Sequence, residues 1–537
     1  MKQLWAELAQ RPAVLRGICV LLLIPAFFIN LGLMPLLADE SIRAMVSLEM
    51  IISGNYITPT MSGEFYYNKP PLYNWILAGL FQLTGSFSEL VVRLPSVVPL
   101  LLFGLTIFWF VKKHLGFETG FLAALLTVTC GRMVVYASML GHIDLFYSLV
   151  TYASFIVIYE GFRKEKWWFL FLVSYGLVSI GFLSKGLPSL VFQGFTLLAY
   201  FIIKKDFKRL FSIQHICGFL LFLLVVGTYF YVYHQYNSLE AYLTTLWTQS
   251  SQRTVLEKEW YESFLHLFVF PFDTLYHILP WSLLVIYAAR RGFWRLVMKH
   301  DFLQFNFIVL FANIWVYWLS PETLPRYIFM LYPLIFTIIC WFYVQYREED
   351  RKRTKVLHSL LFVLISAITL ALLVPFFQLP VEVPYRYGKS IALFLGAAFL
   401  VWAFIKIPRQ RLIIAVMVLL IGRIGFNWFV LPERQANATE SRFKEEGIVI
   451  ARLSEGRDVK FVGPIGPDLD IRYYIQRENK TIVRYGPGSA NRDTTSFYIS
   501  TQRFIDDCPH QLIHSFHSIP QNTTFFLVKY EEPCMYP

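Results

Sequence analysis

The chain has few charged residues. Asp, Glu, Lys and Arg make up only 16% of the 537 residues, compared with about 25% in typical soluble domains. Hydrophobic residues make up 56%, above the usual range of about 45–50%. Many uncharged runs reach the roughly 18–25 residues that cross a bilayer. This composition excludes a soluble globular protein and indicates a polytopic membrane protein.

Cysteine is also scarce, with six residues in the whole chain. Four lie in apolar runs, where we expect them to act as small apolar side chains: Cys19, Cys130, Cys217 and Cys340. Cys508 and Cys534 lie in the more polar C-terminal region. An oxidising compartment would permit a disulfide there, but spacing alone leaves the pairing open.

The sequence shows no internal repeat, and no A-x-A-like cleavage site follows its first apolar run. The basic N-terminal stretch is therefore expected to precede a retained first span rather than a signal peptide. The net charge of +12 fits Lys and Arg gathered in cytoplasmic loops, and we expect no nucleic-acid partner.

Apolar runs bounded by charge predict about thirteen transmembrane helices. Basic residues concentrate in alternate loops, which predicts a cytoplasmic N-terminus and an extracytoplasmic C-terminus. The expected spans are 14–36, 90–111, 118–137, 144–162, 167–184, 187–203, 214–234, 273–289, 301–319, 326–346, 356–377, 388–405 and 411–431.

The composition changes at about residue 432. Long apolar runs give way to short alternating stretches such as DVKFVG and TTFFLV, separated by turn-rich GPIGPD and YGPGSAN. This pattern predicts a small α/β domain. We therefore expect a transmembrane domain at 1–431 and an extracytoplasmic domain at 432–537.

Two predicted outer loops are long, at about 37–89 and 235–272, and long loops are often functional. Both contain amphipathic helix-like stretches, such as ESIRAMVSLEMII, that are expected to lie in the membrane interface. Ionisable residues gather at this predicted outer edge: Asp39, Glu40, Arg43, Lys69, Asp144, Lys185, Arg253 and Arg326.

Ionisable groups near the membrane usually pair or serve a function. Lys and Arg neutralise phosphate, and a carboxylate can accept a proton from an attacking hydroxyl. The pattern therefore favours a site for a phosphate-bearing lipid substrate. Alternative roles remain: Arg43, Lys185 and Arg326 as snorkelling anchors, and Asp39 as a helix N-cap.

Several motifs resemble the GT-C superfamily of aminoarabinose transferases and protein O-mannosyltransferases, which use polyprenyl-phosphate sugars. The first loop carries Asp39-Glu40, Glu49-Met50 and SGNYITPTMSGEFYYNKPPLYNW. Further matching stretches are VVRLPSVV, HID at 142–144, SKGLP at 184–188 and PRYIFMLYP at 325–333. The resemblance extends over about the first 340 residues and implies a helical GT-C fold with an outer C-terminal domain.

The resemblance also implies roles for individual residues. Asp39 corresponds to the candidate catalytic base, and Asp144 to the acid of the second loop. Lys69, Arg253 and Arg326 are expected at the donor phosphate. The remaining pocket residues are expected to be Glu40, Arg43, Tyr66, Tyr67, Asn68, His142 and Lys185.

The chain departs from this family at two points. The family often has DE-x-R-Y-A where this chain has DESIRA. The branch that modifies lipid A places Glu before the lysine, where it can help to hold zinc, and this chain has Asn68 there. The donor substrate is expected to be a polyprenyl-phosphate sugar. A divalent metal stays open as a cofactor, and the residues at this position do not support one.

The expected function is transfer of a sugar, with inversion, from a polyprenyl-phosphate donor to a lipid A-type glycolipid at the outer face of a bacterial inner membrane. One alternative is a protein O-glycosyltransferase with the same donor class. Others are a lipid-linked sugar transporter and a non-catalytic scaffold. If residues around 510–517 are helical, His510, His514 and His517 share a face that could bind a metal.

Overall fold

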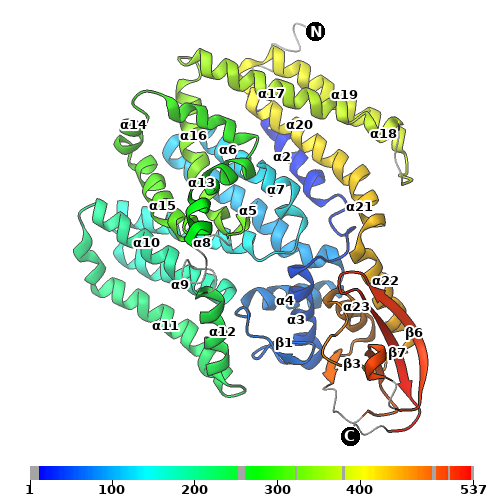
Figure 1. The fold of residues 1–537 in the computed structure, drawn as a ribbon. Coiled ribbons are helices and arrows are strands. Elements are labelled where there is room, and N and C mark those ends of the chain that lie inside the picture. Colours follow the sequence, from blue (N-terminus) through cyan, green and yellow to red (C-terminus); the bar gives the residue numbers. More distant parts are fainter. Residues whose placement is uncertain are drawn as a thin grey trace. The chain divides into compact units, whose positions relative to one another are not determined.

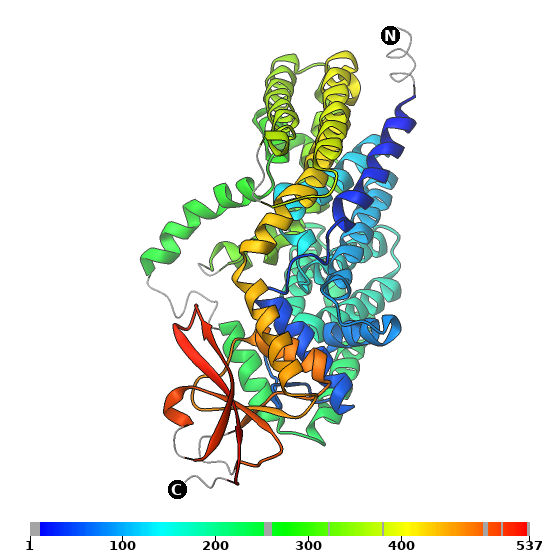
Figure 2. The ribbon, with the colours of Figure 1, turned by 90° about the vertical axis from the view of Figure 1, so that its right-hand side faces the viewer.

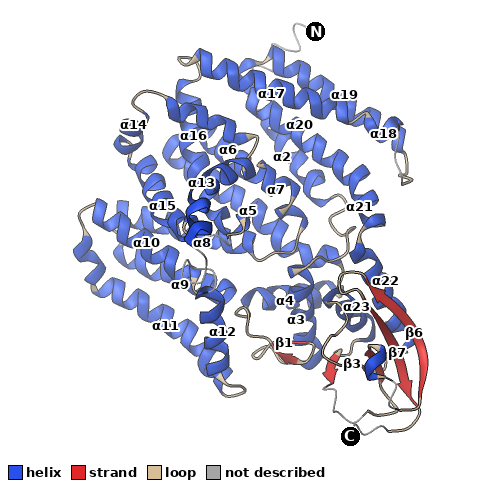
Figure 3. Ribbon diagram, in the orientation of Figure 1, coloured by secondary structure: helices blue, strands red, loops and turns tan. Residues whose placement is uncertain are grey.

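The computed structural model describes residues 11–251, 260–320, 323–377, 381–486, 492–505 and 508–533. Helices dominate, and strands are confined to a short hairpin and a C-terminal sheet (Figure 3). The chain forms two compact units. Unit 1 comprises Met1–Leu31, Ser96–Thr228 and Leu243–Pro432, and unit 2 comprises Gly32–Pro95, Tyr229–Tyr242 and Glu433–Pro537.

Unit 1 contains almost all of the long apolar helices (Figure 1), of which α5, α11 and α12 also extend into unit 2. The α-helices are α2 (Pro12–Phe28), α5 (Glu89–Leu115), α6 (Phe117–Thr129), α7 (Gly131–Val135), α8 (Asp144–Arg163), α9 (Trp167–Lys185), α10 (Pro188–Ile203), α11 (Ile213–His234), α12 (Leu239–Ser251), α13 (Trp260–His277), α14 (Phe293–Lys299), α15 (Asp301–Trp318), α16 (Tyr332–Tyr346), α17 (Arg351–Ala371), α18 (Val374–Phe377), α19 (Arg386–Lys406) and α20 (Arg411–Gly425).

Short 3-10 and π-helical segments connect these helices. The 3-10 segments are η1 (Ala137–Met139), η2 (Phe207–Phe211), η4 (Trp281–Ala289), η5 (Pro325–Leu331) and η6 (Pro408–Gln410), and η7 (Phe426–Val430) is π-helical. Helix α21 (Leu431–Asn437) follows at the boundary between the units.

The chain is a multi-pass membrane protein. Within the described residues, 8 helices are long and apolar enough to cross a membrane, or 9 if one bent pair counts as a single span. The thirteen spans therefore stay a prediction. Helices α2 and α10 are apolar but shorter, with 17 and 16 residues.

The sequence predicts one continuous span over 118–137, but the structure bends it by 45° between α6 and α7. The backbone N–H of Gly131 donates to the carbonyl oxygen of Leu279 over 2.6 Å. The indole N–H of Trp281 donates to the carbonyl oxygen of Thr129 over 3.1 Å. Since these groups bond to another segment, the helical hydrogen-bond ladder is interrupted at this point.

Unit 2 combines the first long loop with the C-terminal domain. The loop forms α3 (Asp39–Ser53), the hairpin β1 (Thr60–Met61) and β2 (Glu64–Phe65), and α4 (Leu72–Thr84). Helix α3 buries ten residues and packs against α4 and α23, so its apolar side is covered by protein within this unit. The interfacial location of this helix stays a prediction.

The C-terminal segment is α/β, as predicted. Its five-stranded sheet has the order β4-β3-β5-β7-β6, with β3 parallel to β4 and β5, and β7 antiparallel to β5 and β6. The elements are α22 (Thr439–Leu453), β3 (Val459–Val462), α23 (Leu469–Asn479), β4 (Arg484–Gly486), β5 (Phe497–Ser500), η8 (Gln502–Phe504), β6 (His510–Ser518) and β7 (Thr523–Tyr530). A core that includes Phe443, Ile471 and Phe525 joins the helices to the sheet.

Close helix packing in unit 1 depends on small residues, as is usual between transmembrane helices. A Cβ atom added at Gly218 of α11 would lie 2.8 Å from Cδ2 of Tyr175 and 2.9 Å from the carbonyl oxygen of Phe171, both in α9. At Gly227, also in α11, nothing lies within 4 Å of such an atom. Of these two positions, only 218 requires glycine, because α9 lies too close there for a larger side chain.

We predict that Gly218→Ala destabilises the protein, because overpacking typically costs about 1–3 kcal/mol. The matched substitution Gly227→Ala should be neutral or slightly stabilising, since alanine favours a helix by about 1 kcal/mol over glycine. Thermal unfolding of both variants in detergent measures the difference. Equal melting temperatures would contradict the packing argument.

Candidate functional site

Three charged side chains meet at one end of α8 and α9 in unit 1. Nζ of Lys185 lies 2.5 Å from Oδ1 of Asp144, and Nε of Arg326 lies 3.7 Å from Oδ2 of the same carboxylate. Helices α8 and α9 pack together and are joined by the short segment 164–166. Because that connection is short, the first residue of α8 and the last residue of α9 lie at the same end, and η5 brings Arg326 to them.

This cluster is almost completely buried. The side chains of Asp144 and Lys185 are each 5% exposed, and that of Arg326 is 14% exposed. Nζ of Lys185 also lies 4.9 Å and 4.5 Å from the ring centroids of Tyr147 and Tyr327. Buried charges are costly unless they are paired and well hydrogen-bonded, and cation–π contacts add to the stabilisation of a buried lysine.

His142 completes the cluster. Nη1 of Arg326 lies 3.2 Å from Nδ1 of His142. The hydroxyl of Ser96 donates to the backbone carbonyl of His142 over 2.7 Å, which fixes the segment before α8. The structure thus brings together four residues predicted from the sequence to be functional: His142, Asp144, Lys185 and Arg326.

In unit 2, Glu40 holds the start of α3 rather than facing an open pocket. Its two carboxylate oxygens accept from Nε and Nη2 of Arg93 over 2.9 and 3.0 Å. Oε2 also accepts from the backbone N–H of Leu37 over 3.1 Å. The guanidinium of Arg93 donates to the carbonyls of Met34 and Pro35 as well. Charge-assisted bidentate pairs of this kind are strong and directional.

Asp39, Arg43 and Tyr66 lie within electrostatic reach of one another. Burial raises the pKa of Tyr66, the nearby Arg43 opposes this shift, and the Asp39 carboxylate adds to it. The guanidinium of Arg43 lies 5.6 Å from the Tyr66 ring centroid. Asp39 is the half-buried first residue of α3.

The segment from Tyr66 to Lys69 follows the hairpin. The hydroxyl of Tyr67 accepts from the Asn237 side chain over 3.1 Å, and its ring packs against Tyr242 at 5.9 Å. Lys69 is half-buried beside Pro70, whereas Asn68 is exposed. These contacts fix the backbone on both sides of Lys69.

Glu49 organises the hairpin that precedes this segment. Its fully buried carboxylate accepts from the Thr60 hydroxyl over 2.7 Å and from the backbone N–H groups of Ser62 and Gly63 over 2.6 and 3.1 Å. A fourth bond, of 2.9 Å, comes from the side-chain amide of Gln476 in α23. Glu49 was noted in the sequence only as part of a motif, and its partner Gln476 is too distant in sequence to be predicted.

The C-terminal domain makes further polar contacts with the first loop, none of which the sequence predicted. Asp470 accepts from the hydroxyl of Ser41, and burial raises the pKa of Asp470 to about 6. The phenol of Tyr474 donates to Oε1 of Glu89 over 3.0 Å, and Nζ of Lys444 lies 2.7 Å from the same oxygen. Within unit 2, these hydrogen bonds and ion pairs therefore connect the first loop to the C-terminal domain.

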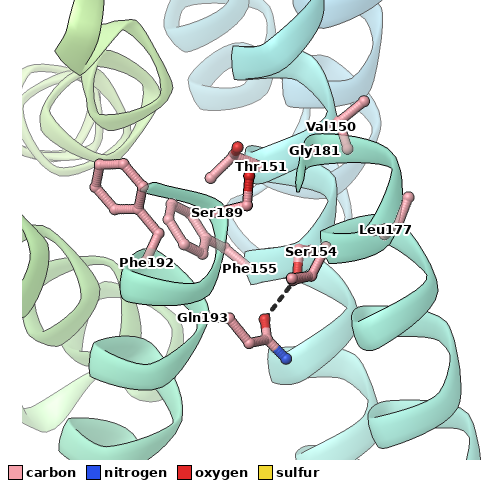
Figure 4. A pocket seen from close by; sticks show the side chains of 10 residues that line it. Val150, Thr151, Ser154, Phe155, Leu177, Gly181, Ser189, Phe192 and Gln193 are labelled. Atoms are coloured by element: carbon pink, nitrogen blue, oxygen red, sulfur yellow. Dashed lines mark hydrogen bonds between the residues drawn. The ribbon is translucent and has the colours of Figure 1, made fainter. Parts of the chain in front are cut away.

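A cavity between α8, α9 and α10 contributes no substrate site. Its volume is about 10 Å³, which is about one water molecule. Figure 4 shows the Ser154 hydroxyl donating to Oε1 of Gln193 over 2.9 Å beside it. The cavity is a small packing defect lined by both apolar and polar side chains.

The described residues contain no group of three or more His, Cys, Asp or Glu side chains that could hold a metal ion. The neutral, exposed Asn68 fits a metal ligand set poorly, and we derive no step through a metal. The segment with His510, His514 and His517 is strand β6 rather than a helix, and His514 pairs with Glu446.

Two residues with predicted roles lie outside the described residues. One is Arg253, expected at the donor phosphate, and the other is Cys534. Cys508 is disulfide-bonded in the structure.

Comparison with known proteins supports the fold. The family model for dolichyl-phosphate-mannose-protein mannosyltransferases matches residues 68–233. An uncharacterised protein of Aquifex aeolicus is 25% identical over 58% of this chain and 61% of its own length. The undecaprenyl phosphate-alpha-4-amino-4-deoxy-L-arabinose arabinosyl transferase 2 of Proteus mirabilis is 26% identical over 35% of this chain and 36% of its own length. The chain thus spans less than two thirds of these curated relatives.

The structural similarity covers nearly the whole chain. The crystal structure of ArnT from Cupriavidus metallidurans bound to undecaprenyl phosphate aligns with a TM-score of 0.69. The alignment covers 95% of this chain and 97% of that one, at 15% identity. The apo structure of the same protein aligns with a TM-score of 0.66. The similarity shows that this chain has the helical GT-C fold of that structure.

Proposed function

We propose that this chain transfers a sugar from a polyprenyl-phosphate donor to an acceptor at the extracytoplasmic face of a bacterial inner membrane. The observation that carries the proposal is the buried cluster of Asp144, Lys185 and Arg326 at the ends of α8, α9 and η5. Similar proteins provide support, since one is named an undecaprenyl phosphate aminoarabinose transferase and another was crystallised with undecaprenyl phosphate.

The cluster suits the phosphate end of such a donor. The guanidinium of Arg326 and the ammonium of Lys185 can donate charge-assisted hydrogen bonds to phosphate oxygens. Asp144 holds both cations in position, which makes it a positioning residue in this proposal rather than a base. Preorganised cations stabilise the negative charge that develops on the leaving phosphate, often the largest catalytic contribution.

Residues of unit 2 keep the roles that the family resemblance implies. Lys69 binds the donor phosphate, and Asp39 orients or deprotonates the acceptor. Attack on the anomeric carbon from the side opposite the phosphate forms the new glycosidic bond, releases polyprenyl phosphate and inverts the configuration. Arg253 is proposed as a further phosphate ligand on the resemblance alone.

We propose a lipid A-type glycolipid as the acceptor, and a Ser or Thr hydroxyl of a secreted protein as the alternative. Deletion of the gene separates them. A mass shift in lipid A supports the first, and a mass shift confined to secreted proteins supports the second. No mass change in either class would contradict both.

We predict that Arg326→Gln weakens binding of polyprenyl phosphate about 10- to 100-fold, because a hydrogen bond to a charged group is worth about 1.5–3 kcal/mol. Titration of the purified protein with the lipid phosphate measures this affinity. The matched control is Arg290→Gln, since Arg290 also pairs with an acid, Asp350, at 2.6 Å. Equal affinities for both variants and the wild type would remove Arg326 from the donor site.

The effect of Asp39→Asn depends on the acceptor. A lipid phosphate is already an anionic nucleophile, so only positioning is lost and the turnover number should fall modestly. A hydroxyl needs proton removal, so the turnover number should fall about 100- to 10,000-fold. Single-turnover transfer from a purified donor distinguishes these outcomes. An unchanged rate with a hydroxyl acceptor would show that Asp39 is not the base.

A further inference from the structure

A second, basic cavity lies within unit 1, away from the Asp144 cluster. Its volume is about 530 Å³. Cationic, polar and apolar side chains line it, and the lining contains no acidic residue among those described. The lining residues are Arg347, Arg351, Thr354, Lys355, His358, Ser359, Phe362, Val363, Phe404, Ile405 and Arg411.

The cavity forms where four helices end together. Arg347 directly follows α16, Arg351 begins α17, Ile405 lies near the end of α19, and Arg411 begins α20. Helices α17, α19 and α20 pack against one another and run side by side (Figures 1 and 2). Positive charge in these loops predicts that this end is cytoplasmic.

The walls of the cavity are arranged by polarity along α17. Arg351, Lys355 and Phe362 recur at helical spacing and so share one face, and Val363 lines the cavity beside Phe362. The two cations occupy its first turns, and the apolar pair follows further along the span. Val363 is 67% exposed and Ile405 is 48% exposed, so the wall below the cations is apolar and accessible to lipid.

The cations of the cavity differ in how they are held. Arg347 pairs with Glu118 over 2.6 Å. Arg411 donates from Nε to the carbonyl oxygen of Phe404 over 2.9 Å, and its Nη1 lies 3.1 Å from Nδ1 of His358. These two arginines are therefore fixed by neighbouring protein groups.

Arg351 and Lys355 are not fixed by any neighbouring acid in the described part of the chain. Both are exposed, and neither forms an ion pair with another described residue. The nearby Asp350 and Glu349 pair instead with Arg290, at 2.6 and 2.9 Å. Two cations at the mouth of the cavity thus remain available to an anion.

We infer that this cavity binds the phosphate headgroup of an anionic membrane lipid. Basic pockets between transmembrane helices on the cytoplasmic side bind such headgroups, and the apolar wall along α17 matches acyl chains. A soluble phosphate would use the cations but not that wall. The site lies at the opposite end of the Pro325–Tyr346 span from Arg326, so it does not depend on the proposed function.

The experiment uses the purified full chain in neutral detergent and a fluorescent phosphatidylglycerol. We expect the double substitution Arg351→Gln/Lys355→Gln to weaken binding about 30-fold. Each cation near a lipid surface strengthens binding about fivefold, and the two factors multiply. The matched control is Lys352→Gln/Lys406→Gln, which removes the same charge from exposed residues of the same helix ends outside the cavity. Its affinity should stay close to that of the wild type.

Several outcomes would overturn the inference. Equal weakening in both double variants would indicate general surface electrostatics. Equal affinity for phosphatidylcholine would show that the headgroup charge is not recognised. Displacement of the lipid by inorganic phosphate at constant ionic strength would identify a soluble phosphate as the ligand instead. Melting temperatures of the two double variants, measured in parallel, control for misfolding.

Discussion

The carboxylate of Glu49 is the constraint on which unit 2 depends. A fully buried carboxylate is unfavourable unless its oxygens accept several hydrogen bonds, and Glu49 accepts four, from Thr60, Ser62, Gly63 and Gln476. Three of these donors close the hairpin that leads to Tyr66 and Lys69. The fourth comes from α23, so the conformation of the first loop depends on a helix more than four hundred residues away.

Glu40, at the start of α3, has a structural role of its own. Glu40 is held in a bidentate pair by Arg93 and accepts from the backbone N–H of Leu37, just before the helix begins. Those contacts give Glu40 a structural role at the start of α3. The adjacent Asp39 is the acid of this pair to which the proposal assigns the acceptor.

The sequence predicted the helical membrane fold and the α/β character of the C-terminal segment, because periodicity and composition act locally. It also singled out His142, Asp144, Lys185 and Arg326 as candidate site residues, but not their contacts with one another, and their roles stay predictions. The break at Gly131 could not be predicted, because it depends on the carbonyl of Leu279. Neither could the pairing of Glu40 with Arg93 or of Glu49 with Gln476, because these partners come from distant segments. Strand β6 was open to misreading because His510, His514 and His517 fit a helical spacing.

The Pro325–Tyr346 span links the two charged regions of unit 1. Arg326 lies at its first turn beside Asp144, and Arg347 follows its last residue and pairs with Glu118. Twenty-two residues of helix extend roughly 30 Å, about the thickness of the hydrocarbon core. Each end is therefore fixed by an arginine–carboxylate pair near a membrane surface. The phosphate-binding groups proposed at one end and the lipid-binding cavity inferred at the other are therefore separated by about the length of one span.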